Sequence, residues 1–250
     1  MLLYYNNSMK RIKIFPIFNQ AAPRVWDDFL RIRTITRQHN YNINSSPTDI
    51  NDALTEFKEN WSRPSQNFAL AAYDNNEIIG FVSGTYNAKI ARIQHLYVLP
   101  QYQGMHIGRQ LLDAAESAIS VNTIQVDLIS MGNSDKFYEK YGYKSYTQTN
   151  HYNKTVKNAG HCAVTPVFRC SPTLIKQFAK LSNTTPNEFD TQKIAQTHTP
   201  LFIYRDTNSK ITAFGVCGHT PKIYGTSDWA KTRIAKAITE YQSMFTVSTK

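Results

Sequence analysis

Apolar residues recur along the first 150 positions with two different spacings, which separate helices from strands. Steps of three and four residues predict helices that begin near Pro23, Ser46 and Ile107, each with its apolar residues on one face. Alternating or nearly continuous apolar runs predict strands over 13–18, 68–73, 78–85, 93–98 and 124–129. Turn-forming residues separate the second strand from the third, so these two strands are expected to form a hairpin.

The helix near Ser46 has the residues expected at a helix start. The Ser46 side chain can cap free N–H groups, Pro47 suits the first helical position, and Asp49 favours the positive end of the helix dipole. The buried face of this helix is expected to consist of Ile50, Leu54, Phe57 and Trp61.

A short helix is expected farther along, capped by Asn133 and Ser134 and ended by Gly142 in a left-handed conformation. Residues 143–146 and a stretch after His151 would form a last hairpin. The order is then strand, two helices, three strands, helix, strand, helix, strand. This order predicts a mixed α/β domain over residues 9–152.

A smaller α/β unit is expected over residues 163–250, after a polar linker from Asn153 to Gly160. Its predicted elements are strands at 164–168, 201–204 and 211–217, a helix from Pro172, and a helix from Asp228 to about Tyr241. The last helix is expected to bury Trp229, Ile234 and Ile238.

The second unit partly repeats the first. Pro16, Phe29 and the hairpin at 74–81 match Pro166, Phe178 and the hairpin at 206–214. A degenerate partial copy of the first unit and a chance similarity both account for matches this short.

Composition and charge narrow the class of protein. The chain of 250 residues is 41% hydrophobic and 18% charged, as globular proteins are. A net charge of +10 fits either a solvated basic surface or attraction to a polyanion. No run of five like charges occurs, which argues against a nucleic-acid partner. The sequence contains no run of about eighteen apolar residues, the length needed to span a membrane. We therefore expect a cytoplasmic protein with no membrane partner.

The cysteines indicate neither a disulfide framework nor a metal site. Cys162, Cys170 and Cys217 are odd in number and all lie in the last ninety residues, which favours buried thiols in a reducing compartment. Their spacing from His161 and His219 does not match paired metal ligands, so no metal is expected.

A strand, a short loop and a helix start follow one another between Leu96 and Leu112. A helix start offers unpaired N–H groups and a positive dipole end, and Gly104 and Gly108 allow the backbone to approach a phosphate closely. An ordinary strand–loop–helix turn has the same pattern. A second segment, Asn133–Tyr143, follows the next strand at the distance of one crossover, and the two segments together favour a pyrophosphate site.

With these two segments in this order, the sequence resembles the GNAT superfamily of acetyltransferases over roughly residues 9–155. Residues 103–108, Gln-Gly-Met-His-Ile-Gly, are similar to its acetyl-CoA loop Q/R-x-x-G-x-G/A, and residues 133–143 are similar to its N…FYEKxGF helix. The resemblance implies a mixed, mostly antiparallel sheet flanked by helices. It also implies acetyl-CoA as cosubstrate and an amine-bearing small molecule or peptide as acceptor.

The resemblance implies roles for individual residues. The backbone of Leu96, Tyr97 and Val98 would pair with the pantetheine arm. The pyrophosphate would be held by the N–H groups of Gln103, Gly104, Met105, His106, Ile107, Gly108 and Arg109. Asn133 would lie beside the cofactor arm, and Tyr138 would protonate the departing thiolate, whose free thiol has a pKa of about 8.5. The alternative for Tyr138 is a core aromatic residue.

Two positions depart from the family pattern. His106 replaces the central glycine of the loop, so a side chain must point outward or contact the phosphates when protonated. Many members have a glutamate base on the fourth strand, where this chain has Arg92 and Gln94. His95, on the opposite face from Gln94, is then the nearest candidate base. The amine could instead lose its proton to bulk water.

The leading interpretation is an N-acetyltransferase with Tyr138 as general acid. A non-catalytic module of GNAT fold that binds acetyl-CoA or a partner protein is the alternative, and both departures favour it. The acceptor amine and the oligomeric state, a homodimer included, stay open. The C-terminal unit is expected to act structurally, by covering the first unit or closing its acceptor cleft.

Overall fold

The computed structural model describes residues 12–17, 24–61, 67–87, 89–119, 125–132, 134–146, 150–156, 164–168, 170, 172–184, 200–208, 210–218 and 220–246. The elements up to residue 156 are β1 (Lys13–Pro16), α1 (Arg24–Tyr41), α2 (Pro47–Trp61), β2 (Asn67–Asp74), β3 (Glu77–Tyr86), β4 (Ile90–Val98), the 3₁₀ turn η2 (Pro100–Tyr102), α3 (Ile107–Ile119), β5 (Gln125–Ile129), α4 (Asp135–Lys140), β6 (Lys144–Ser145) and β7 (His151–Thr155). The elements that follow are β8 (Val164–Val167), α5 (Pro172–Ser182), β9 (Leu201–Arg205), β10 (Ile211–Val216), β11 (Lys222–Gly225) and α7 (Asp228–Thr246).

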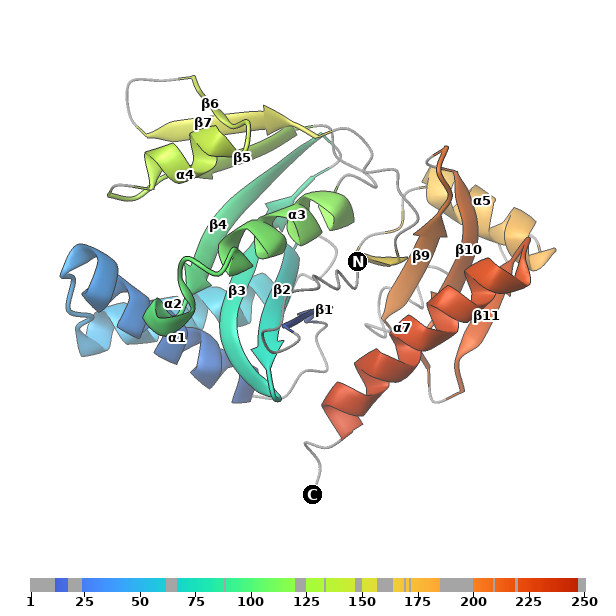
Figure 1. Ribbon diagram of the computed structural model, residues 1–250, viewed down its shortest axis with the longest axis horizontal. Helices are drawn as coiled ribbons and strands as arrows, with labels where there is room; N and C mark the ends of the chain where they lie inside the picture. The colour runs from blue at the N-terminus through green and yellow to red at the C-terminus, as the bar shows by residue number, and fades with distance from the viewer. Residues whose placement is uncertain are drawn as a thin grey trace.

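Seven strands form one sheet in the order β1-β2-β3-β4-β5-β7-β6 (Figure 1). Neighbouring strands are antiparallel except β4 and β5, which are parallel. A parallel pair needs a crossover connection, and α3 forms it. The mixed, mostly antiparallel sheet predicted from the sequence is therefore confirmed.

Helices cover both faces of this sheet. Neighbouring residues of a strand point to opposite faces. On β3, the ring of Phe81 stacks on Phe29 of α1 with centroids 3.9 Å apart, and it also contacts Phe57 of α2. A Cβ on the adjacent Gly80 would lie 3.3 Å from the Leu111 side chain of α3. Thus α1 and α2 lie on one face and α3 on the other.

The start of α2 follows the prediction closely. The backbone N–H of Asp49 donates to Ser46 Oγ at 3.1 Å, and the N–H of Ser46 donates to Asp49 Oδ2 at 3.0 Å. This reciprocal pair satisfies N–H groups that the helix itself leaves free. Of the expected apolar face, Phe57 is buried and Ile50 and Leu54 are half-buried, while the Trp61 side chain lies outside the described residues.

A second, four-stranded antiparallel sheet has the order β11-β10-β9-β8. Phe178 of α5 stacks on Phe214 of β10 at 4.4 Å, and a Cβ on the adjacent Gly215 would collide with Ile234 of α7. Helices therefore flank this sheet on both faces as well. The sequence did not predict β11, because the apolar pair Ile223 and Tyr224 is too short to stand out between Pro221 and Gly225.

The second sheet repeats the pairing register of β1 to β4. One rung of the first sheet joins Phe15, Ala71, Phe81 and Tyr97. The corresponding rung of the second sheet joins Thr165, Ile203, Phe214 and Tyr224. Both hairpins also contain one extra residue at the same place, Ile79 in the first and Thr212 in the second. This agreement supports a degenerate partial copy, one of the two explanations that the sequence left open.

The two units differ after their last shared strand. Residues 99–106 separate β4 from α3, whereas only Thr226 and Ser227 separate β11 from α7. The second unit therefore has no counterpart of the glycine-containing loop.

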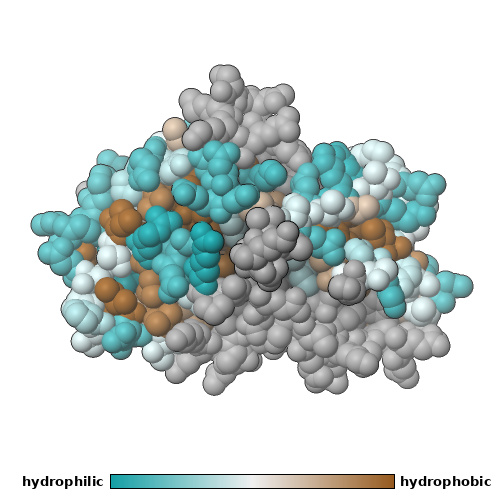
Figure 2. Space-filling model, turned by 90° about the horizontal axis from the view of Figure 1, so that it is seen from below, coloured by the Kyte–Doolittle hydropathy of each residue, from teal (hydrophilic) through white to brown (hydrophobic). Residues whose placement is uncertain are grey.

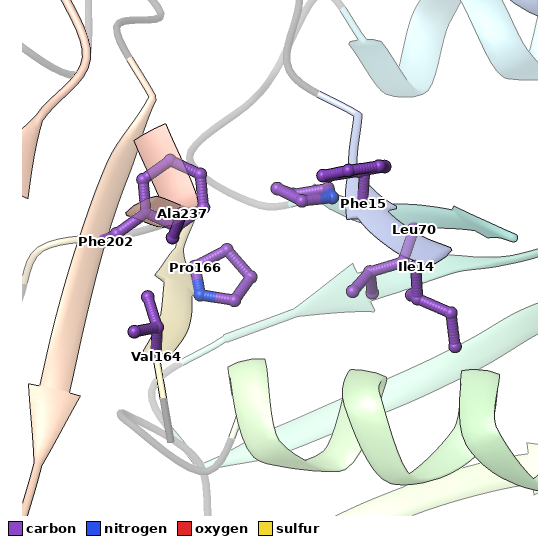
Figure 3. Close-up of a pocket in the computed structure, with 8 residues that line it drawn as sticks. Ile14, Phe15, Leu70, Val164, Pro166, Phe202 and Ala237 are labelled. Atoms are coloured by element: carbon purple, nitrogen blue, oxygen red, sulfur yellow. The ribbon is translucent and has the colours of Figure 1, made fainter. Parts of the chain in front are cut away.

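The two sheets share one buried apolar cluster. From the second unit it includes Phe202, Tyr204, Ala213, Cys217, Ala230, Ile234, Ile238 and Tyr241. Side chains of both units face each other across a cavity of about 20 Å³, to which Ile14 and Leu70 contribute from one side and Val164 and Phe202 from the other (Figure 3). These residues occupy matching positions in the two registers. The second unit thus completes the core of the first.

Three details of the sequence prediction are wrong. Trp229 is 55% exposed, because the buried face of α7 follows Ala230, Ile234, Ala237, Ile238 and Tyr241. The expected linker from Asn153 begins inside β7, whose pairing with β5 continues to Thr155. Ser134 precedes α4 but makes no capping hydrogen bond, because its own backbone is helical.

Other features of the surface and the thiols agree with a globular protein. None of the described helices is long and apolar enough to cross a membrane. On the face in Figure 2, hydrophobic residues form small separate groups among hydrophilic ones. Burial raises the pKa of the Cys170 thiol to about 12 and that of Cys217 to about 11. The described part of the chain holds no group of three metal-ligating side chains, and Cys162, His161 and His219 lie outside it.

Candidate active site

Strand β4 loses one of its two neighbours halfway along its length. β5 pairs with it from Ile90 to Ile93 only. Beyond that point β4 pairs with β3 alone within the described residues, and β5 diverges toward α4 (Figure 1). The free edge contains Leu96 and Tyr97, two of the residues predicted to bind the pantetheine arm. Buried backbone groups are nearly always paired, so an extended ligand with amide groups fits this edge.

The carbonyl of Val98, the third predicted residue, is already bound by the chain itself. It accepts hydrogen bonds from Thr36 Oγ1 at 3.2 Å and from Gln103 Nε2 at 2.9 Å. Gln103 Nε2 also lies 3.3 Å from Asn40 Oδ1. The side chain of Gln103 therefore fixes the loop to β4 and α1, a role that the sequence did not suggest.

The loop turns through two left-handed residues, Gly104 with φ of +78° and His106 with φ of +61°. Turns that alternate between left- and right-handed residues direct successive N–H groups to one side, where they bind anions. A Cβ at residue 104 would meet no atom within 4 Å, so the space beside the loop is open. The helix α3 begins at Ile107 and adds its own free N–H groups. This geometry fits a pyrophosphate.

The left-handed backbone also explains why the GNAT loop pattern has a glycine at the position that His106 occupies here. A residue with a Cβ pays roughly 1–2 kcal/mol in this conformation, although histidine tolerates it better than most. The His106 side chain is exposed. Histidine in place of glycine therefore strains the backbone at residue 106 but leaves the turn intact.

The backbone N–H of Gln103, predicted to hold the pyrophosphate, instead donates to the Pro100 carbonyl at 3.1 Å. Ile107 is buried and anchors the start of α3, Met105 is 46% exposed, and Gly108 packs beside the ring of Phe137. The Arg109 side chain turns toward α4, where its guanidinium lies 5.4 Å from the centroid of Tyr141 and its Nε lies 3.4 Å from Asp113 Oδ2. The positive charge of Arg109 therefore already interacts with groups of the protein itself.

Tyr138 lies on α4, the helix that follows β5 after this strand has separated from β4. Its ring is buried edge-on against Phe137 at 5.1 Å and Tyr143 at 5.8 Å. Burial raises the pKa of Tyr138 above the usual value, and the nearby Tyr41 and Tyr97 add to the rise. Gly142 ends α4 with φ of +83°, as predicted. Asn133 lies outside the described residues.

The end of α1 reaches the start of α4. The hydroxyl of Tyr41 lies 3.1 Å from Ser134 Oγ, and the ring packs so tightly on Gly132 that a Cβ there would lie 2.7 Å from it. Tyr41 of α1 and Tyr97 of β4 both lie within electrostatic reach of Tyr138 on α4.

His95 points to the α1–α2 face and packs on Phe57 and Tyr97. Its Nε2 lies 3.4 Å from Glu56 Oε1 of α2, in a poor geometry for a hydrogen bond. This contact with His95 holds the pKa of Glu56 below its usual value, against the effect of partial burial.

Sequence reasoning missed Thr36, Tyr41 and Glu56. All three lie on α1 and α2, far along the chain from the loop and from α4. The only local signal was for Tyr41. It follows Arg33 and Arg37 at four-residue steps, so the side chains of Arg33, Arg37 and Tyr41 lie in one stripe of α1.

Replacing His106 by glycine should relieve the backbone strain. We expect the free energy of unfolding to rise by up to about 1 kcal/mol, and the affinity for CoA to stay the same or increase. The matched control is Gly104→Ala, which should cost about 1 kcal/mol, since its effect comes from the backbone alone. Denaturant unfolding and calorimetric titration with CoA measure both quantities. Weaker CoA binding by His106→Gly would instead show that the imidazole contacts the cofactor.

Comparison with known proteins assigns the domain. The family model for the acetyltransferase (GNAT) domain matches residues 38–157. Among solved structures, PaiA N-acetyltransferase from Thermoplasma acidophilum in complex with coenzyme A is 20% identical, with a TM-score of 0.49 over 58% of this chain and 98% of that chain. A GNAT-family acetyltransferase from Staphylococcus aureus Mu50 is 17% identical, with a TM-score of 0.49 over 58% and 99% of the two chains. A Pyrococcus horikoshii protein is 14% identical, with a TM-score of 0.44 over 91% and 76%. No curated protein matches the sequence. On the match of the family model, residues 38–157 form a GNAT acetyltransferase domain, which makes the protein an acyltransferase.

Proposed function

We propose that the protein transfers the acetyl group of acetyl-CoA to a primary amine by direct attack in a ternary complex. The observation that carries this proposal is the free edge of β4, which is followed by the left-handed turn at Gly104 and His106, together with the buried phenol of Tyr138 on α4. Acetyl-CoA, when bound, supplies an activated thioester. The chain then has to hold it, orient it and move two protons.

Tyr138 is the proposed general acid. Its phenol is buried and its pKa is raised, so it holds its proton at neutral pH and has one to give to the departing thiolate. Backbone N–H groups near Val98 would polarise the thioester carbonyl.

His95 is the proposed acceptor of the amine proton. Glu56 Oε1, 3.4 Å from Nε2 of His95, would act as the carboxylate that orients the base. Loss of the proton to bulk water is the alternative. A His95→Gln variant separates them. As general base, His95 should contribute on the order of 100-fold to kcat, whereas an unchanged kcat would favour bulk water.

Turnover of acetyl-CoA with a panel of primary amines tests the proposal as a whole. We expect release of free thiol that depends on both the amine and the enzyme. Binding of CoA without turnover on any amine would favour the non-catalytic module instead, and the absence of CoA binding would leave a protein-interaction role. The replaced glycine at 106 and the missing glutamate at 92 and 94 are the features that favour these alternatives.

We further propose that the C-terminal unit is structural. It lacks the loop of residues 99–106, shares the core of the first unit, and carries the free thiols Cys170 and Cys217, which suit a reducing compartment. The expected division into domains 9–152 and 163–250 therefore describes two sheets that depend on one core.

A further inference from the structure

A stripe of positive charge on α1 borders the proposed acceptor side of the site. Arg33, Arg37 and Tyr41 follow one another at four-residue steps, so their side chains lie along one face of the helix. Thr36, next to this stripe, donates to the Val98 carbonyl and so holds α1 against the end of β4. The arginines are thereby placed beside the half of β4 that has lost its second neighbour.

Electrostatic effects place both arginines close to the proposed chemistry. Burial raises the pKa of Tyr97, and the charges of Arg33 and Arg37 act against that rise. Tyr97 in turn adds to the raised pKa of Tyr138. Because α1 and α3 lie on opposite faces of the sheet, the arginines lie on the α1 side of Tyr97, within electrostatic reach of its phenol.

The guanidinium groups have nitrogen atoms without partners. Nε and Nη1 of Arg33 and Nε of Arg37 are shielded from solvent, and none of them has a hydrogen-bond partner among the described residues. Leaving charged N–H groups buried and unpaired is costly, so such groups indicate a missing acceptor. Guanidinium nitrogens are suited above all to carboxylate and phosphate oxygens.

The nearby carboxylates do not supply the missing hydrogen-bond acceptor. Asp49 Oδ2 accepts from the N–H and the hydroxyl of Ser46 at 3.0 and 2.8 Å. Glu56 lies 3.4 Å from His95 Nε2, and neither acid forms an ion pair with an arginine within the described chain. The two arginines act on these carboxylates through their charge, but the named guanidinium nitrogens receive no hydrogen-bond acceptor from them. This asymmetry argues against a polycationic acceptor, which would need free carboxylates.

We infer that the acceptor is a primary amine that also carries an anionic oxygen group, carboxylate or phosphate, which Arg33 and Arg37 bind. The inference rests on the proposed function and narrows its substrate class. The anionic group would lie at the α1 stripe and the amine near the thioester, with Tyr97 between the two positions. Recognition at one end then orients the nucleophile at the other.

Matched acceptor pairs test this inference. Glycine, β-alanine and γ-aminobutyrate are compared with their primary amides, and phosphoethanolamine with ethanolamine. We expect the wild type to prefer the anionic member of at least one pair through a lower KM, and the pair that shows the preference tells carboxylate from phosphate. In Arg33→Gln and Arg37→Gln, KM for the anionic acceptor should rise about ten- to hundredfold with KM for its neutral partner unchanged.

Controls separate this inference from the proposed function. Arg24→Gln removes the same charge from the exposed start of α1 and should leave the preference intact. CoA affinity should be equal in all variants, and a loss in the Arg33 or Arg37 variants would overturn the inference by assigning the arginines to the cofactor. A wild type without anionic preference, or variants that keep it, would overturn it as well.

If no amine turns over, the proposed function fails, and binding decides the inference on its own. The thermal stability of the CoA complex is then measured with β-alanine and phosphoethanolamine against β-alaninamide and ethanolamine. Stabilisation by an anionic member alone, lost in the double arginine variant, would keep the anion site. Equal shifts within both pairs would remove it.

Discussion

Tyr138→Phe is expected to lower kcat by on the order of 100-fold, with little change in the affinity for CoA, because the variant removes a proton donor and leaves the ring in place. The ring packs edge-on against Phe137 and Tyr143, contacts that phenylalanine keeps, so stability should change little. Steady-state kinetics with calorimetry of CoA binding measures the two effects separately. Tyr146→Phe removes an exposed hydroxyl from the same region and serves as the control.

The pH profile gives a second check on Tyr138. Its raised pKa means that the phenol stays protonated well beyond the range in which free tyrosine ionises, near pH 10. The rate should therefore show no alkaline decline from this group below about pH 10. A Tyr138→Phe enzyme as fast as the wild type would remove the tyrosine from the mechanism.

Ending the chain after Val156 is expected to abolish cooperative folding of the first unit. The truncation uncovers apolar side chains of β1 and β2 that now face the second unit, among them Ile14 and Leu70 (Figure 3). Each buried side chain of this kind contributes about 1.5–3 kcal/mol, so losing several would remove most of a domain stability of roughly 5–15 kcal/mol. Soluble yield and the binding of a hydrophobic dye measure the outcome.

A graded variant keeps this prediction from depending on expression alone. Phe202→Ala opens the shared cluster without removing the unit and should cost about 3–5 kcal/mol, measured by denaturant unfolding. A truncated protein that is soluble and fully active would show that the C-terminal unit is dispensable.

Much of the fold could be predicted because periodicity determines each element locally. The apolar faces of α1 and α3, the hairpin of β2 and β3, and the left-handed Gly142 all follow from spacing or from one residue type. The failures have local causes too. Trp229 lies only one residue from the buried Ala230, so an apolar residue at the edge of the stripe was assigned to its centre. The pairing register, which needs the structure, adds support for a repeat that the short sequence matches alone could not distinguish from chance.

The residues of the candidate site also fall into two groups, those that the sequence could identify and those that need the structure. The turn at residues 103–109 and the helix with Tyr138 are contiguous motifs, and their residues could be named from sequence. The contact of His95 with Glu56 and the position of Arg33 beside Tyr97 join separate elements, and no spacing along the chain encodes them. The conformation of His106 also needed the structure, since a left-handed φ is invisible in the sequence except through the glycine it replaces.

A structure of the protein crystallised with CoA tests the central claim most directly. The account predicts the pyrophosphate against the N–H groups of residues 104–108, the pantetheine amides along Leu96 and Tyr97, and the sulfur beside the Tyr138 hydroxyl. CoA bound at another surface, or a sulfur atom remote from Tyr138 with the turn left empty, would contradict it.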